Sequence, residues 1–146
     1  MTDTVDAATR SRMMSGIKSQ NTKPEVFIRK ALHAVGFRYV LGGGGLPGKP
    51  DLIFPSRRAV VFVNGCFWHR HDCELFKWPR TNKQFWQQKL DGNSKRDSRI
   101  KRQLNVLGWR VFTVWECELR KTKYKIPNNA VSRVSRLLKN IDNMKP

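Results

Sequence analysis

The sequence predicts a single α/β domain in which helices flank a mixed central sheet. The chain has 146 residues, of which 39% are hydrophobic, and a chain of this size can bury one core without disulfides. The expected elements run in the order helix, three strands, helices, strand, which is typical of an α/β domain. The third strand of this series, residues 59–63, is apolar throughout, as in a central strand that is covered on both faces.

The chain divides into three parts. Residues 1–20 are polar and basic without a sustained period, and we expect a flexible arm that can lie along a phosphate backbone. Residues 21–120 contain the expected domain. Residues 121–146 are basic, and the helix expected at 131–141 is predicted to pack on the same domain.

A first helix is predicted to begin at Thr22 and to end at Gly36. Thr22 and Glu25 have the spacing of a capping box, and Pro24 is tolerated in a first turn. Capping this helix can be the only role of Glu25. Glycine is typical of a helix C-terminus, and apolar residues recur on one face of the helix, namely Ile28, Ala31, Leu32 and Val35.

Three strands are expected next. Residues 37–40 alternate between apolar and polar side chains, and a glycine-rich loop follows at 42–45. Residues 51–54 and 59–63 read as adjacent strands because a short turn separates them.

The second half of the chain is predicted to contain an irregular loop at 64–80 and then two helices. Thr81 and Gln84 repeat the capping-box spacing, and residues 91–93 are expected to break the helical run. The second helix is expected to end at Gly108. A strand at 109–114 and a short helical turn at 116–120 follow.

The charge of the chain points to a polyanionic partner. Lys and Arg number 29 against 11 Asp and Glu, a net charge of +18, and nucleic acid is the commonest polyanion that such a surface meets. A membrane surface fits less well because no strongly apolar amphipathic stretch accompanies the charge. No apolar run reaches the ~18 residues of a membrane span, and the N-terminus lacks a signal-peptide core, so we expect a cytoplasmic protein.

All three cysteines can belong to one metal site. Cys66, His71 and Cys73 lie close together in the sequence, and Cys117 is the remaining cysteine. A set of three cysteines and one histidine suits a closed, tetrahedral structural zinc site. The alternative is that the cysteines are small buried hydrophobes. His69 could also take the place of His71, and the spacing leaves this choice open.

A carboxylate site is predicted where one strand begins and its neighbour ends. Asp51 starts a strand and Val63-Asn64 end the adjacent one, so these positions can meet at one edge of the sheet and hold Mg²⁺. His69 can act as a general base, and Asp97 can orient its imidazole. The plainer alternatives are a turn-forming Asp51 and an ordinary helix-surface charge at Asp97.

Aromatic residues accompany the cysteine-rich loop. Phe67 and Trp68 lie between the expected zinc ligands, in sequence that is poor core material, and such side chains can wedge between base pairs. On the following helix we expect Phe85 to be core rather than a DNA contact. Trp86 and Leu90 fall at helical spacing, as core residues do.

Five short motifs follow one another between residues 46 and 117. They are Leu46-Pro47-Gly48-Lys49-Pro50-Asp51; Gly65-Cys66-Phe67-Trp68-His69 with His71 and Cys73; Asn93 with Arg96-Asp97; Gly108-Trp109-Arg110-Val111; and Val114-Trp115-Glu116-Cys117. In this combination they resemble the very short patch repair (Vsr) DNA mismatch endonucleases, and the resemblance extends from about residue 10 to residue 120, most of the chain. The resemblance implies a restriction-endonuclease-like PD-(D/E)xK core in αβββαβ order. It also implies an enzyme that nicks DNA at T·G mismatches by hydrolysing the phosphodiester 5′ to the mispaired T.

The resemblance also assigns a role to each candidate residue. It implies magnesium ligands at Asp51 and the backbone carbonyl of Val63. It implies a general base at His69 with Asp97 as its partner, and support for the water around the metal from Glu25. The implied structural zinc ligands, which favour His71 over His69, are Cys66, His71, Cys73 and Cys117. The side chains implied to enter the duplex beside the mismatch are Phe67, Trp68 and Trp86.

Asn64 departs from the family pattern, which usually has histidine at this position. Asparagine forms hydrogen bonds but does not transfer protons. The alternatives are therefore a zinc-stabilised DNA-binding module without catalysis, or a same-fold nuclease of different specificity. The expected partners are double-stranded DNA with a T·G mismatch and general mismatch-repair proteins, with no membrane. The expected state is a monomer in a bacterial cytoplasm, associated with the nucleoid.

Overall fold

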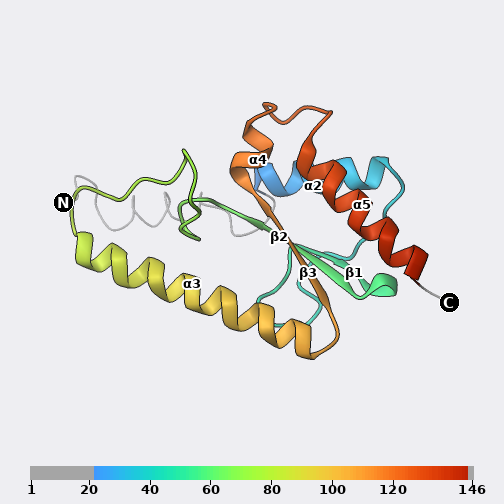
Figure 1. The fold of residues 1–146 in the computed structure, drawn as a ribbon, viewed down its shortest axis with the longest axis horizontal. Helices are drawn as coiled ribbons and strands as arrows, with labels where there is room; N and C mark the ends of the chain where they lie inside the picture. Colours follow the sequence, from blue (N-terminus) through green and yellow to red (C-terminus); the bar gives the residue numbers. More distant parts are fainter. Residues whose placement is uncertain (1–21, 145–146) are drawn as a thin grey trace, which may run out of the picture.

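Three strands form one mixed sheet at the centre of the computed structural model, which describes residues 22–144 (Figure 1). The strands are β1 (Leu52–Phe54), β2 (Ala59–Asn64) and β3 (Arg110–Trp115). β1 pairs antiparallel with β2, and β2 pairs parallel with β3. The prediction of an α/β architecture with a mixed sheet is confirmed. The arm expected at residues 1–20 lies outside the described residues.

Helices cover both faces of this sheet (Figure 1). Side chains alternate along each strand, so Phe54 and Val61 belong to the core with α2 (Lys23–Ala34) and α5 (Asn129–Met144). Val60 packs on the opposite face against Leu104 of α3 (Lys83–Val106). The first half of β2 is buried on both faces, as its apolar sequence predicts.

The ends of α2 follow the predicted signals. Thr22 Oγ1 accepts a hydrogen bond from the N–H of Glu25 at 3.4 Å, and Ile28 and Leu32 are fully buried. Gly36 lies just past the helix with φ of +101°, a backbone conformation that favours glycine. The predicted helix is therefore confirmed.

A buried asparagine begins α5. Asn128 Oδ1 accepts hydrogen bonds from the N–H groups of Ala130 and Val131 at 2.9 and 3.2 Å. Its Nδ2 donates to the carbonyl of Glu118 at 3.0 Å. One side chain thus caps α5 and ties it to α4 (Glu116–Arg120), the short helix that the sequence predicts after β3.

The strand predicted at residues 37–40 is wrong except at its last residue. Only Val40 pairs, in an isolated bridge with Ile53. Residues 37–39 would have to pair with residue 54 and beyond, but β1 ends at Phe54 and a 3-10 helix follows at Pro55–Arg57. The four glycines at 42–45 all have positive φ and turn the chain away on the other side of Val40.

The break predicted at residues 91–93 is also wrong, because α3 is one continuous helix of 24 residues. Glycine in a helix costs only about 1 kcal/mol, and the polar neighbours of Gly92 point to partners outside the helix. Asp91 forms an ion pair with Arg70, and Asn93 Nδ2 donates to the carbonyl of Trp68 at 3.0 Å. The capping box predicted at Thr81 is absent, since the helix is preceded by Asn82 without a side-chain cap.

Candidate active site and metal centre

A cleft of about 720 Å³ opens where β2 and β3 end and β1 begins. The alternation of side chains turns the polar ends of all three strands toward the same face as Val60, the face covered by α3. The lining residues from the strands include Asp51, Asn64 and Thr113. The opposite wall is formed by residues of α3, namely Arg96, Asp97, Ser98, Ile100 and Lys101.

Asp51 is held at the base of this cleft by the neighbouring strand. Its Oδ2 accepts a hydrogen bond from the N–H of Val63 at 2.7 Å. Burial raises the pKa of Asp51 to about 6; the Val63 hydrogen bond acts against this rise, and the charge of Glu25 adds to it. Glu25 is only 6% exposed and lies 4.0 Å from the guanidinium of Arg29. Two carboxylates therefore influence one another in a poorly solvated place, an arrangement that a cation would stabilise.

His69 and Asp97 form a pair on the other side of the cleft. His69 Nδ1 and Asp97 Oδ2 lie 2.5 Å apart, and both residues line the cleft. The loop after β2 carries His69, and the hydrogen bond from Asn93 to the backbone of Trp68 fastens this loop to α3. Since Nδ1 is engaged by the carboxylate, Nε2 is the ring atom that can exchange a proton.

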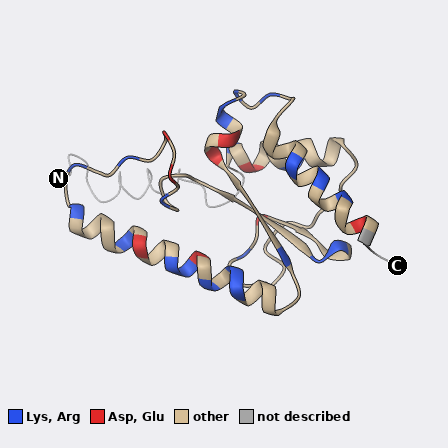
Figure 2. Cartoon of the chain, viewed as in Figure 1, with Lys and Arg blue, Asp and Glu red and all other residues tan. Residues whose placement is uncertain are grey.

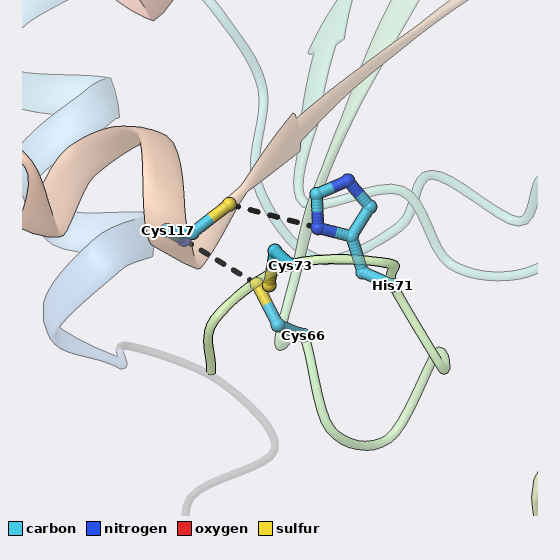
Figure 3. Close-up of side chains that lie close together, drawn as sticks. All are labelled: Cys66, His71, Cys73 and Cys117. Atoms are coloured by element: carbon cyan, nitrogen blue, oxygen red, sulfur yellow. Dashed lines mark hydrogen bonds between the residues drawn. The ribbon is translucent and has the colours of Figure 1, made fainter. Parts of the chain in front are cut away.

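Four side chains from the loop after β2 and from α4 converge on one point, as Figure 3 shows. The ligand atoms of Cys66, His71, Cys73 and Cys117 all lie within 4.8 Å of one another. Zn–S bonds of about 2.3 Å in a tetrahedron place sulfur atoms roughly 3.8 Å apart, so the spacing fits one ion. Burial raises the pKa of the Cys66 thiol to about 12, and a bound cation would instead favour the thiolate. The cluster therefore suggests a structural zinc site, with His71 rather than His69 as its histidine.

Trp115 joins the zinc cluster to the cleft. Its indole stacks on the His71 imidazole with ring centroids 4.0 Å apart and an interplanar angle of 9°, and it meets His69 edge-on at 6.2 Å. Trp115 has no role among the residues expected from the sequence. Its position two residues before Cys117, at the end of an expected strand, is the signal that could have placed it near both sites.

The aromatic residues of the loop and of α3 form one cluster. The ring of Phe67 lies 5.2 Å from Trp68 and 5.5 Å from Trp86, and Trp68 is 40% exposed. The structure thus brings together the three residues implied to enter the duplex. Phe85 was expected in the core, and this is wrong: it is 57% exposed because the first turns of α3 extend beyond the sheet (Figure 1). Leu90, five residues further along, is fully buried.

Known proteins match this chain over most of its length. The family model described as DNA mismatch endonuclease Vsr matches residues 2–75. The DNA mismatch endonuclease Vsr of Escherichia coli is 43% identical over 120 residues, which covers 82% of this chain and 77% of that protein. The chain belongs to the Vsr DNA mismatch endonuclease family. The resemblance found in the sequence motifs is confirmed.

Other relatives of this Vsr-family chain carry different names. The type II nicking enzyme V.XorIIP of Xanthomonas oryzae is 44% identical over 119 residues, covering 82% of this chain and 88% of that protein. The type II nicking enzyme V.NmeAIP of Neisseria meningitidis is 39% identical over 143 residues, covering 97% of each chain.

Vsr-family membership makes this chain a DNA nicking endonuclease with DNA as its substrate. The alternative of a DNA-binding module without catalysis is therefore set aside. These relatives are bacterial proteins. Within residues 22–144, no helix combines the length and the apolar character needed to cross a membrane.

Proposed function

We propose that this endonuclease nicks DNA at T·G mismatches, hydrolysing the phosphodiester 5′ to the mispaired T, with the cleft around Asp51 as its active site. The observation that carries the proposal is the meeting of the Asp51 carboxylate and the His69–Asp97 pair in one cleft. Hydrolysis of a phosphodiester needs both a place for a cation and a group that takes a proton from water. The proposal includes the αβββαβ restriction-endonuclease-like core that the family implies.

The donor set at Asp51 fits Mg²⁺. Magnesium prefers carboxylate and carbonyl oxygens together with water, and Asp51 offers a carboxylate whose charged form burial disfavours in the absence of a cation. We assign Asp51 and the backbone carbonyl of Val63 as ligands and Glu25 as a nearby acceptor for water. When bound, Mg²⁺ supplies positive charge that offsets the negative charge developing on the phosphate.

His69 acts as the general base in this proposal. Its Nδ1–H donates to Asp97 Oδ2, which leaves Nε2 as the proton acceptor. Water loses its proton to Nε2 as its oxygen bonds to phosphorus, and the bond from phosphorus to the leaving oxygen breaks. Asp97 stabilises the imidazolium that forms. Asn64 lines the same cleft and can hydrogen-bond to water or phosphate, but it cannot take the proton.

The aromatic cluster supplies the mismatch contact. Phe67, Trp68 and Trp86 lie together on the part of the molecule formed by the loop and the first turns of α3, and apolar wedges of this kind unstack base steps. The zinc cluster holds this loop to α4 and so fixes the wedge relative to His69.

The test compares wild type with Asp51→Asn on end-labelled duplexes, one with a T·G mismatch and one fully matched. We expect wild type to nick only the mismatched duplex, 5′ to the T, and Asp51→Asn to bind it without nicking. Asp142→Asn is the matched control, because Asp142 lies on α5 and pairs with Arg57. Nicking by Asp51→Asn at the wild-type rate would refute the proposed site.

A second candidate specificity is that of a type II nicking enzyme. It is favoured by the names of the relatives from Xanthomonas oryzae and Neisseria meningitidis. A panel of duplexes that varies the mismatch and the flanking bases separates the two candidates. Nicking that depends on the flanking sequence in matched DNA would favour the second.

A further inference from the structure

Two lysines line the cleft without an acidic partner among residues 22–144. Lys49 lies on the loop before β1 and Lys101 on α3, and both belong to the cleft that contains Asp51. The neighbouring acids of α3 are already engaged, since Asp97 pairs with His69 and Asp91 with Arg70. Among the described residues, the structure gives neither lysine ammonium an ion pair.

The backbone around Lys49 is held in place by close packing. Lys49 has φ of +49°, a left-handed conformation that costs about 1 kcal/mol or more in a residue other than glycine. A Cβ on Gly43 would come within 3.0 Å of Lys49 Cβ, and a Cβ on Gly48 would come within 2.5 Å of Ile100 Cγ2. The loop therefore has no spare room on either side.

This packing brings the two lysines to one rim. Gly48 touches Ile100, and each of these residues is followed directly by one of the two lysines. Arg96, the other cation on this wall, donates to Asn93 Oδ1 at 2.8 Å and is drawn back along its own helix. The lining of the cleft that contains Asp51 thus includes lysines from two different elements, and neither has an ion-pair partner among the described residues.

We propose that Lys49 and Lys101 form a binding site for DNA phosphate at the mouth of the cleft. Lysine binds phosphate as a compact point charge with three donors, and a pair from two neighbouring elements at one rim can hold the backbone of the strand to be cut. The cleft also contains the carboxylates of Asp51 and Asp97, which repel a phosphodiester, so cations at the rim are needed to bring the strand in. This inference rests on the proposed function of the cleft.

The test measures DNA binding against salt for Lys49→Gln, Lys101→Gln and the double variant, in the Asp51→Asn background so that no nicking occurs. Glutamine keeps most of the side-chain length and removes the charge. Each single variant is expected to lower the magnitude of the log–log salt slope by about 0.9 and to weaken binding equally to T·G and matched duplexes. Lys101→Arg is expected to retain the wild-type slope. Lys139→Gln is the matched control: it removes the same charge at a position on α5 away from the cleft, and it is expected to leave the slope unchanged.

Nicking by the same lysine variants, with Asp51 restored, connects the site to the reaction. We expect KM to rise about tenfold for each variant, with a smaller change in kcat, because a phosphate contact of this kind contributes to binding of the ground state as well. Melting temperatures equal to wild type would show that the loop is intact. Unchanged slopes and unchanged KM would overturn the proposal. If Asp51→Asn retained nicking while the lysine slopes still fell, the proposed active site would fail and the phosphate site would lose its link to catalysis.

Discussion

His69 is the side chain whose removal has the clearest expected effect on the reaction. A positioned general base contributes about 10²–10⁴-fold, so His69→Ala is expected to lower the single-turnover nicking rate by that factor and to leave DNA affinity nearly unchanged. Asp97→Asn is expected to show a smaller loss, since the imidazole keeps a hydrogen-bond partner. His33→Ala is the control, because His33 is exposed on α2 and its ring neighbour is Tyr39. A His69→Ala rate close to wild type would exclude this base.

Individual site residues differ in how far the sequence predicts them. Asp51 and Asn64 could be brought to one cleft from the sequence because strand order and alternation fix where their positions meet. The choice of His71 over His69 depended on the family resemblance, since both histidines lie in an irregular loop whose path has no periodicity. The stacking of Trp115 on His71 could not be predicted, because it depends on how that loop returns to the end of β3.

Within α3, a glycine offers a direct test of helix continuity. A Cβ on Gly92 would meet nothing within 4 Å, and alanine is favoured over glycine in a helix by about 0.5–1 kcal/mol. Gly92→Ala is therefore expected to raise the free energy of unfolding by that amount in urea denaturation. Gly48→Ala is the contrasting variant, because it has φ of +75° and its Cβ would meet Ile100 at 2.5 Å. A loss of stability in Gly92→Ala would show that α3 bends or breaks at this residue.

The cap of α5 is the second element to test. Asn128→Ala removes acceptors for two backbone N–H groups and leaves the Glu118 carbonyl without its donor. Helix caps and buried hydrogen bonds each contribute about 1 kcal/mol, so we expect a loss of about 1–3 kcal/mol in the free energy of unfolding. Asn140→Ala, at an exposed position of the same helix, should be neutral or slightly stabilising. Equal effects of the two variants would contradict the capping role.

Elements with a strong period or cap were predicted well, and elements decided by tertiary contacts were not. α2 and β2 could be predicted because their apolar pattern and end signals agree. The break predicted at Gly92 does not occur. Asp91 and Asn93, which are typical of turns, instead contact the neighbouring loop from within a continuous helix. Residues 37–40 have a strand pattern, but strand formation also needs a partner along the whole length.

At the scale of the whole molecule, zinc is expected to connect two segments that lie far apart in the sequence. The cluster joins the loop after β2 to α4 after β3, so its removal frees the loop that carries His69. Treatment with a zinc-selective chelator, with Mg²⁺ in excess, is expected to lower the melting temperature and to abolish nicking together. Each kcal/mol lost corresponds to about 2–4 °C in a chain of this size. Re-addition of zinc, but not of further magnesium, should restore both; nicking that survives the loss of zinc would contradict this role.

One face of the sheet holds most of the core, and the other face holds the cleft. α2, α4 and α5 pack on the face that holds most of the buried core, whereas α3 covers the face with the cleft. Figure 2 shows lysine and arginine at intervals along α3 from its first residue onward, with none in its last turn. Of the candidate catalytic residues, Glu25 alone comes from α2. The others, Asp51, Asn64, His69 and Asp97, line the cleft on the face that α3 covers.

The length of α3 has a mechanical consequence. Its buried residues are Leu104, in the core, and Leu90, and the helix runs past the sheet toward the aromatic cluster (Figure 1). From Leu104 to Phe85 an α-helix spans roughly 28 Å, so a tilt of about 5° at its base would move the far end by roughly 2.5 Å. Asp97 lies on α3 between these two residues, so it moves with the helix. Under the proposed function, a base stack that presses on the first turns of α3 would therefore also displace Asp97, and with it the hydrogen bond between Asp97 and His69.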